Sequence, residues 1–511
     1  MLLHATSCCI MQLRERSRGM MSRTFIFSVA SGILVAALLA AGCSSAGNTA
    51  RVDSAGTQGG PRTHHSAAAL GNRIDALMVD SLFPPASAAV RIVSLSDNIV
   101  LYERNAQLLF TPASNQKLFT SAAALHLLGP LFRITTVAGF DSAAGKIFLR
   151  GGGDPLLSTS DLDSLASTLR GLLPPGGSWT LVGDASRFDS LYWGPGWMWD
   201  DAADPSGMGI SALSVNGNTV EVSVRGGPAP GSPPEVTVIP PTGFVQVMNR
   251  AVVSDSVVRE LTIARPLQHP SNVILVDGEL LPGQQVSVTL TVFEPDRYTL
   301  TLFAEALSRV GIRCSAAVMD TMPGSVRPAA AVSRRLDSVV TFMNTVSDNL
   351  SAECLVKLMG AESAGTPGTW QSGIRAVKNF LASIGIDTAR ITLVDGSGFS
   401  RYNLTNAETI VRLLVAMAHD QEAGRSFMAS LPVAGEAGTL SRRMRRTAAA
   451  HLLKAKTGTM TGVSSLSGYT TGADGEPLAF SIMMQNFPGS SHSYRAIQDS
   501  IGVLITGWEG R

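Results

Sequence analysis

The sequence predicts a mixed α/β fold of the α+β type, in which a large, mostly β region interrupts a domain of helices and strands. Segments with helical spacing of apolar residues and segments that alternate like strands occur towards both ends of the chain. Between them, residues 220–292 are rich in Val and Thr and contain Pro pairs, as in short antiparallel strands. With 511 residues the chain is too long for one hydrophobic core, so we expect two or three domains.

The bulk composition excludes one class of partner. Lysine and arginine together number 40, aspartate and glutamate 39, and the formal net charge at pH 7 is +1. Because the chain has no excess of positive charge, it offers no long-range attraction to a nucleic acid, and we predict no nucleic-acid partner.

The N-terminus has the pattern of a targeting segment. Four arginines precede the apolar run at 25–41, which ends in Leu39-Ala-Ala-Gly-Cys43. A basic start, a short apolar core and small residues before a cut are typical of a secretory signal, and the final cysteine makes this one resemble a bacterial lipoprotein signal. We therefore predict a signal peptide at 1–42, lipid on Cys43, and an exported, periplasmic protein held at a membrane. A plain signal peptide and an uncleaved anchor are the alternatives.

The segment after Cys43 does not look folded. Residues 43–71 are rich in Ser, Gly, Ala and Thr, a composition that predicts a flexible tether. The mature chain would keep only Cys314 and Cys354 as further cysteines, which is not a disulfide framework.

The first domain is predicted to combine residues 72–137 with residues 306–511, because helical and strand periodicities of the same kind occur in both parts. Before the insertion we expect a helix at 72–82, strands at 87–94 and 99–102, and a helix that runs to Leu125. Towards the C-terminus we expect helices at 298–310, 332–345, 354–359, 369–384 and 406–418, strands at 451–457, 463–470 and 478–485, and a helix at 494–505.

Residues 138–305 are predicted to form the insertion. Its expected elements are strands at 146–150 and 179–182, a helix at 161–173, and short antiparallel strands over 220–292. The glycine-rich turn at 151–153 is not a dinucleotide fingerprint, because its spacing is wrong and no helix follows at once.

The segment Thr111–Leu125 contains the first candidate for chemistry. Ser114 and Lys117 are three residues apart near the start of a predicted helix, so they share one face of it. A serine needs a nearby base to become a nucleophile, and a desolvated lysine can act as that base. Ser-x-x-Lys alone is weak evidence, because the pattern is common at ordinary helix starts.

The scarcity of lysine strengthens this candidate. Only six lysines occur in the chain, and arginine is used almost everywhere that a generic cation would serve. Since arginine does not lose its proton in proteins, a retained lysine indicates a place where proton transfer or a compact charge is required.

Three motifs then occur in order along the chain: Ser114-x-x-Lys117, Ser347-Asp348-Asn349 and Lys456-Thr457-Gly458. This set is known from penicillin-binding proteins and class A β-lactamases. Each motif alone could be a helix start, a helix cap or a strand end. Their common order, on a helix, a helix-entry loop and a strand, makes chance coincidence a poor explanation.

The chain resembles the class C low-molecular-mass penicillin-binding proteins, the D-alanyl-D-alanine carboxypeptidase/endopeptidase family. The wide separation of the first two motifs requires the large insertion of that family. Other segments that carry the resemblance are Gly152–Pro155, Gly183–Asp189, Ser211–Asn218, Asp395–Arg401 and Leu431–Thr439. The resemblance covers about residues 72–510 and implies a β-lactamase/transpeptidase-like serine acyltransferase domain that acts on peptidoglycan stem peptides and binds β-lactam antibiotics. It implies no cofactor and no metal.

The resemblance also implies roles for the motif residues. Ser114 would be the nucleophile and Lys117 the base that takes its proton. Ser347 would relay a proton to the leaving amine, while Asn349 would orient Lys117 and the substrate amide. Lys456 would supply positive charge.

Substrate contacts follow from the same resemblance. Thr457, Gly458 and Thr459 would hold the terminal carboxylate, and the backbone N–H groups of Ser114 and Thr459 would form the oxyanion hole. Asn216 is also expected to bind substrate. Relatives that trim diaminopimelate peptides are expected to have an acidic residue near that position, where this chain has a neutral amide.

Four other functions compete with a carboxypeptidase. A class A β-lactamase would need a deacylating Glu in a Glu-x-x-Leu-Asn loop, and none occurs between 349 and 456. An esterase of the same fold usually has Tyr at the position of Ser347, and an α/β-hydrolase would need a Gly-x-Ser-x-Gly motif, which is absent. A catalytically inactive protein that binds penicillin or the cell wall remains an alternative.

Overall fold

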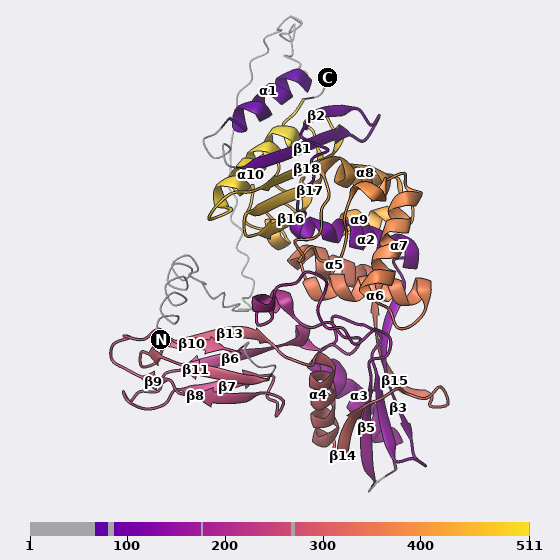
Figure 1. Ribbon diagram of the computed structural model, residues 1–511, viewed down its shortest axis with the longest axis vertical. Coiled ribbons are helices and arrows are strands. Elements are labelled where there is room, and N and C mark those ends of the chain that lie inside the picture. Colours follow the sequence, from indigo (N-terminus) through magenta and orange to yellow (C-terminus); the bar gives the residue numbers. More distant parts are fainter. Residues whose placement is uncertain (1–66, 80–85, 175–176, 267–270, 510–511) are drawn as a thin grey trace, which may run out of the picture. The chain divides into compact units, whose positions relative to one another are not determined.

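The computed structural model describes residues 67–79, 86–174, 177–266 and 271–509 (Figure 1). The predicted signal peptide, Cys43 and nearly all of the predicted tether lie outside these residues. Within the described ranges, no helix has the length and apolar character needed to cross a bilayer.

The first domain is built on a five-stranded antiparallel sheet with the order β16-β17-β18-β1-β2. Its strands are β1 (Ser87–Ser94), β2 (Val100–Arg104), β16 (Lys454–Met460), β17 (Val463–Thr471) and β18 (Pro477–Gln485). The first strand therefore pairs with the last one, from the opposite end of the chain. This pairing brings the Ser114 segment, which follows β2, next to β16 with its Lys-Thr-Gly motif.

Helices cover both faces of this sheet, so successive side chains of strand β1 pack alternately against two helical layers. Val90 and Ile92 pack with α1 (Ala67–Leu77) and α10 (His492–Thr506). Ala89 and Val93 belong to the cluster on the other face, with α2 (Gln116–Leu128) and α8 (Ala407–His419) (Figure 1). A strand buried on both sides reads as a largely apolar run, and in β1 only Arg91 and the terminal Ser87 and Ser94 depart from this pattern.

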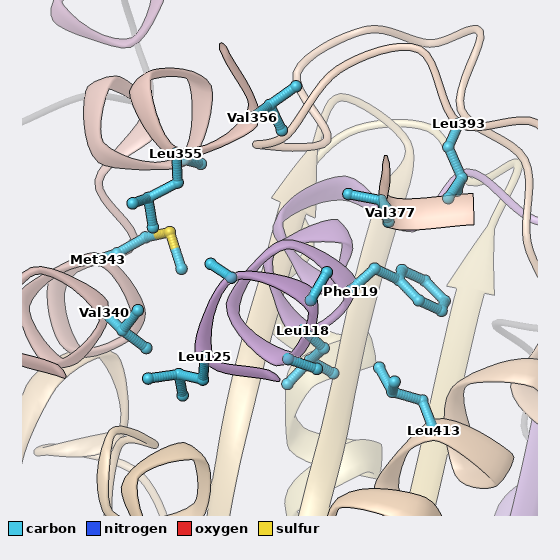
Figure 2. Packing of buried hydrophobic residues seen from close by; sticks show 14 of the residues in the cluster. Leu118, Phe119, Leu125, Val340, Met343, Leu355, Val356, Val377, Leu393 and Leu413 are labelled. Atoms are coloured by element: carbon cyan, nitrogen blue, oxygen red, sulfur yellow. The ribbon is translucent and has the colours of Figure 1, made fainter. Parts of the chain in front are cut away.

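Helix α2 lies at the centre of the second layer. Figure 2 shows its Leu118, Phe119 and Leu125 surrounded by apolar side chains of neighbouring helices, among them Val340 and Leu413. The neighbours are α5 (Leu336–Val346), α6 (Asn349–Ala364), α7 (Trp370–Ser383), α8 and α9 (Gly424–Ala429). Burial on all sides fixes the helix that carries Lys117, and close packing transmits any displacement of it.

The inserted part contains a second five-stranded sheet with the order β14-β5-β4-β3-β15. Its strands are β3 (Arg133–Asp141), β4 (Lys146–Arg150), β5 (Ser178–Asp184), β14 (Arg313–Met319) and β15 (Pro328–Arg335). Helices α3 (Thr159–Leu172) and α4 (Pro295–Arg309) share a hydrophobic core with it.

Three small sheets complete this part, with the orders β13-β6-β7, β10-β11-β8 and β12-β9. Their strands are β6 (Thr219–Arg225), β7 (Glu235–Ile239), β8 (Gln246–Asn249), β9 (Val252–Val253), β10 (Thr262–Ala264), β11 (Val273–Asp277), β12 (Glu279–Leu280) and β13 (Gln285–Thr291). The mixed α/β class with a mostly β insertion is thereby confirmed.

The boundaries of the insertion differ from the predicted 138–305. Strand β3 pairs with β15, so the second sheet begins at Arg133 and ends at Arg335. Residues 306–335, expected in the first domain, supply β14 and β15. The helix expected at 332–345 begins only at Leu336, because Val332 to Arg335 pair with β3 instead.

Helix α1 also differs from its predicted range of 72–82. It begins at Ala67, inside the segment predicted as a tether, and ends at Leu77. Its buried residues Leu70 and Ile74 are four apart and pack on the first sheet, so tertiary packing overrides the poor helix propensity of Gly71 and Asn72. The predicted end at Leu82 lies outside the described residues.

Candidate active site

Ser114 lies in a short 3-10 helix, η1 (Ala113–Asn115), that runs directly into α2. The preceding Ala113 has a φ of 47°, an uncommon left-handed conformation for a residue with a side chain. Gly398 packs against it so closely that a Cβ there would lie 1.8 Å from the Ala113 carbonyl oxygen. Only a glycine at position 398 therefore lets the loop after α7 pack this closely against the turn that carries Ser114.

The Lys117 amine is fully buried beside the serine. Its Nζ lies 3.0 Å from Ser114 Oγ, 2.6 Å from Asn349 Oδ1 and 3.0 Å from the carbonyl oxygen of Ser397. Burial lowers the pKa of Lys117 to about 8, and the nearby carboxylates Glu353, Asp348 and Asp395 oppose this by raising it. An amine with such a pKa can be neutral near physiological pH, as a base for the serine requires.

The second and third motifs meet across the same site. Ser347 ends α5 in the left-handed region, with a φ of 66°, and its Oγ accepts a hydrogen bond from Lys456 Nζ at 2.9 Å. Lys456 also donates to the carbonyl oxygen of Thr457 at 2.9 Å. Burial lowers the pKa of Lys456 well below its usual range, and the charge of Lys117 lowers it further. A bound carboxylate would favour its protonated form.

Two motif residues are structural. Asp348 caps α6 by accepting from the backbone N–H of Ser351 at 2.6 Å. At Gly458 a Cβ would lie 2.2 Å from Ser465 Oγ and 2.7 Å from the carbonyl oxygen of Pro112. Only glycine lets strand β16 approach the Ser114 turn this closely.

A cavity of about 510 Å³ opens over these groups. Its lining residues are Ser114, Met198, Asp201, Asp204, Ser206, Val346, Ser347, Asn349, Gly398, Phe399, Arg401, Thr439, Thr457, Thr459, Met460 and Thr461. The structure thus brings the hydroxyl and amide groups of all three motifs to one cavity, with the two lysines buried behind them.

The predicted substrate-binding residue Asn216 lies away from this cavity. Asn216 contacts the start of α3, where its Nδ2 donates to Thr159 Oγ1 at 2.7 Å and its Oδ1 accepts from Thr159 N at 3.0 Å. It does not line the cavity, so the geometry gives it no contact with a substrate there. Its position was expected from the resemblance, which cannot show where a side chain points. Cys43 lies outside the described residues.

Eleven of the sixteen residues that line the cavity were not predicted as site residues, among them Met198 and the charged Asp201, Asp204 and Arg401. Asp201 is the last residue of η2 (Trp199–Asp201) and Asp204 is the N-cap of η3 (Pro205–Gly207), in a segment for which the sequence predicted no helix or strand. Burial raises the pKa of Asp201, and the neighbouring Asp200 and Asp204 raise it further. The close spacing of three aspartates in this loop was the available signal.

The inserted part reaches the catalytic groups directly. The Nδ2 of Asn349 donates to the carbonyl oxygen of Ser206, in η3, at 2.9 Å. The same amide accepts from Lys117 through its Oδ1. In the part of the chain that the structure describes, no group of three or more His, Cys, Asp and Glu residues could hold a metal ion.

Comparisons with known proteins identify the family of this chain. The family model of the D-Ala-D-Ala carboxypeptidase 3 (S13) family matches residues 70–506. A D-alanyl-D-alanine carboxypeptidase from Actinomadura sp. (strain R39) is 37% identical over 470 residues, which cover 86% of this chain and 84% of the relative. The D-alanyl-D-alanine carboxypeptidase DacB of Haemophilus influenzae is 28% identical over 404 residues, 76% of this chain and 83% of the relative.

A solved structure gives the same result for the fold. The crystal structure of penicillin binding protein 4 from Haemophilus influenzae is similar with a TM-score of 0.75 at 25% identity, over 86% of this chain and 99% of that one. A second structure of that protein, complexed with a β-lactam, has a TM-score of 0.69 at 25% identity, over 84% of this chain and 97% of the other. With its three motifs assembled at one cavity and the family model matched over nearly the whole described chain, this protein belongs to the D-Ala-D-Ala carboxypeptidase 3 (S13) family.

Proposed function

We propose that this protein is a serine-type D-Ala-D-Ala carboxypeptidase that cleaves peptidoglycan stem peptides through an acyl-enzyme and is acylated by β-lactam antibiotics. The observation that carries the proposal is the position of the buried Lys117 amine, 3.0 Å from Ser114 Oγ and 2.6 Å from Asn349 Oδ1, two groups whose residues line the cavity. A nucleophile and a buried base within hydrogen-bond distance are the minimal equipment for acyl transfer.

In the acylation step, Ser114 Oγ attacks the carbonyl carbon between the two terminal D-Ala residues as Lys117 Nζ takes the hydroxyl proton. The backbone N–H groups of Ser114 and Thr459 would stabilise the oxyanion, which is commonly a large electrostatic contribution. When the C–N bond breaks, the leaving amine needs a proton. We assign the delivery of this proton to the hydroxyl of Ser347. Ser347 lines the same cavity, and its Oγ accepts a hydrogen bond from Lys456, so its own hydroxyl proton can point to the leaving amine.

The terminal carboxylate of the substrate would bind at strand β16. The hydroxyls of Thr457 and Thr459 line the cavity there, and Thr457 Oγ1 is held by Thr439 Oγ1 at 2.9 Å. Lys456 lies just behind them, so a bound carboxylate would stabilise its ammonium form and complete a charge-assisted contact.

Two carboxylates in the cavity lining suit a cationic group of the peptide. Asp201 and Asp204 line the cavity from the inserted part, and carboxylates in this position would attract an amino group on the third residue of a stem peptide. We propose that these aspartates take the role that had been expected near Asn216.

The acyl-enzyme formed with penicillin should persist. Glu353 is the first acidic residue that follows the second motif in the sequence, but it does not line the cavity. Its carboxylate oxygens already accept hydrogen bonds from two backbone N–H groups and one indole N–H group. It therefore cannot activate a water for deacylation, which argues against a β-lactamase. The assembled site also argues against a catalytically inactive wall-binding protein.

The test uses a fluorescent penicillin and a peptide that ends in D-Ala-D-Ala. Wild-type protein should be labelled, intact-mass spectrometry should show the adduct for minutes or longer, and free D-Ala should be released from the peptide. Ser114→Ala should melt at a similar temperature with neither activity. Labelling of Ser114→Ala, or release of penicillin within seconds, would contradict the proposal.

A further inference from the structure

Glu353 is a fully buried carboxylate on α6 that the proposed mechanism does not use. Its oxygens accept hydrogen bonds from Gly396 N at 2.9 Å, Ser397 N at 2.7 Å and Trp370 Nε1 at 2.7 Å. All three partners are donors, and only an ionised carboxyl can accept from each of them without offering a proton of its own. Burial and the neighbouring Asp395 raise the pKa of Glu353 to about 7, while these N–H donors lower it.

The segment that Glu353 holds is the one that contacts the base. The carbonyl oxygen of Ser397 accepts from Lys117 Nζ at 3.0 Å, and the carbonyl oxygen of Gly396 accepts from Thr120 Oγ1 at 2.7 Å. Glu353 thus accepts from the backbone N–H groups of Gly396 and Ser397, and helix α2 donates to the C=O groups of the same two residues. A chain of hydrogen bonds connects the Glu353 carboxylate to the Lys117 amine through the Ser397 backbone.

We propose that Glu353 is a positioning residue for Lys117, which fixes the Ser397 carbonyl that aligns the amine with Ser114 and places a negative charge behind that amine. This inference rests on the proposed function, since it gives Glu353 a role only if Lys117 is the base. Glu353 does not contact the cavity, so it acts through the backbone and through its charge.

The charge effect can be assigned a sign. The groups around Lys117 are Glu353 of α6, Asp348 at the N-cap of α6, Asp395 of the loop after α7, and Lys456 of β16. Glu353 also faces Lys357 and Cys354 on its own helix. Burial lowers the pKa of Lys117 to about 8, and Glu353 opposes that shift. Loss of the Glu353 charge should therefore lower the pKa of Lys117 and move the acid limb of the acylation rate to lower pH.

Two variants separate position from charge. Glu353→Asp keeps the charge but shortens the side chain, so it should release the Gly396–Ser397 segment. The double variant Glu353→Gln/Trp370→Phe removes the charge, keeps an acceptor for the two backbone N–H groups, and removes the indole donor that would otherwise face the new NH₂ group. Trp370→Phe alone is the reference for the double variant. In the wild-type protein Lys357 Nζ lies 3.7 Å from the centroid of the Trp370 ring, and the phenyl ring of Phe keeps an aromatic face beneath this amine.

Asp184→Asn is the matched control. Asp184 is also a buried carboxylate that accepts from backbone N–H groups, those of Ser186 and Met322, but it lies in the second sheet without contact to Lys117. The rate of penicillin acylation is measured from about pH 6 to 9 for every variant, with thermal melting alongside.

Glu353→Asp should lower the maximal acylation rate by about 10²-fold, the usual cost of a misplacement of about 1 Å, and leave the acid limb in place. The double variant should move the acid limb to lower pH relative to Trp370→Phe, and each unit of pKa change raises the rate below that limb about tenfold. Asp184→Asn should change only the melting temperature.

The inference is overturned if both Glu353 variants melt lower but keep the wild-type maximal rate and acid limb, as a purely structural residue would. If either Glu353 variant fails to fold, Trp370→Phe becomes the test, because it removes one of the three N–H donors that hold the Glu353 carboxylate. The inference is then overturned if the maximal acylation rate of Trp370→Phe is no lower than that of Asp184→Asn. Absence of any acylation at Ser114 in the wild-type protein would instead mean that the proposed function is wrong.

Discussion

Three of the six lysines, Lys117, Lys357 and Lys456, are fully buried, and each has different partners. Lys357 pairs with Asp189 at 2.6 Å and lies over the Trp370 ring, so it stabilises the contact between α6 and the inserted part. Lys117 has no carboxylate within hydrogen-bond distance among its described partners and contacts Ser114 instead. The scarcity of lysine in the sequence indicated special positions, but only the partners separate a base from a structural cation.

This difference predicts opposite outcomes for one substitution at two sites. Lys117→Arg should lose acylation by about 10²–10⁴-fold, the usual worth of general-base assistance, because a guanidinium does not give up its proton. Lys357→Arg keeps the charge that Asp189 requires and should retain acylation. Penicillin acylation rates and melting curves of both variants check this. Equal rates for the two variants would contradict the assignment of Lys117 as the base.

At the scale of elements, the position of Ser114 depends on a contact between η1 and the loop after α7. Gly398 has a φ of 81°, and a Cβ there would lie 1.8 Å from the Ala113 carbonyl oxygen. Gly385 has nearly the same φ, 80°, but open space around its Cβ position. Substitution of these two glycines therefore distinguishes the effect of backbone strain alone, at Gly385, from strain combined with displacement of the Ser114 turn, at Gly398.

Gly398→Ala should therefore lower penicillin acylation by at least about 10²-fold, since displacement of a reacting group by about 1 Å costs that much. Gly385→Ala should cost only the left-handed strain of about 1–2 kcal/mol and leave the rate unchanged. Stopped-flow acylation and thermal melting distinguish the two. A Gly398→Ala variant that acylates like Gly385→Ala would show that η1 tolerates displacement.

The segment from η2 to η3 allows a test of substrate choice. Replacing Asp201 and Asp204 together by Asn removes both carboxylates from the cavity wall and should reduce hydrolysis of a stem peptide with a free side-chain amine by about tenfold or more, about 1.4 kcal/mol. Hydrolysis of the same peptide with that amine acetylated, and acylation by penicillin, should change little. An equal loss for both peptides would mean that the aspartates support the fold and not recognition.

The elements show how far sequence patterns reach. Strands β1, β17 and β18 were predicted within a few residues, because short segments that contain apolar, β-branched and aromatic residues and lie between turns are a strong local signal. The start of α5 was placed too early, since the pairing of Val332–Arg335 with β3 depends on residues about 200 positions away. The three motifs were also predicted from the sequence, because each is a pattern of only three or four consecutive residues. Asp201 and Arg401 were missed because only the fold brings them to Ser114.

At the scale of the whole molecule, no local pattern defined the extent of the insertion. The second sheet joins β3, before the predicted boundary, to β14 and β15, after it, so 133–335 is the unit that the sheet topology supports. The glycine and aspartate segments of the insertion that carry the family resemblance are mostly structural. Gly152, for example, approaches the backbone of Thr135 so closely that a Cβ would lie 2.2 Å from its carbonyl oxygen.

The attachment of the protein also belongs to this scale, and it stays a prediction from the sequence. We propose that the chain is exported and carries lipid on Cys43, on the evidence of the Leu39-Ala-Ala-Gly-Cys43 pattern. Metabolic labelling with a fatty acid should mark the wild-type protein and not Cys43→Ala, which should instead be released from the membrane fraction. Labelling of the variant at the wild-type level would exclude this anchor.

The double contact of Asn349, with Lys117 on one side and the Ser206 carbonyl on the other, limits how such enzymes can diversify. A chimera that receives the insertion of a relative with another peptide preference also receives a new backbone at the position of Ser206. If that carbonyl is displaced, the amide turns and the base loses alignment, even though no motif residue has changed. Altered selectivity should therefore arise together with compensating substitutions around Asn349, and the order in which these substitutions occur should decide which evolutionary routes remain open.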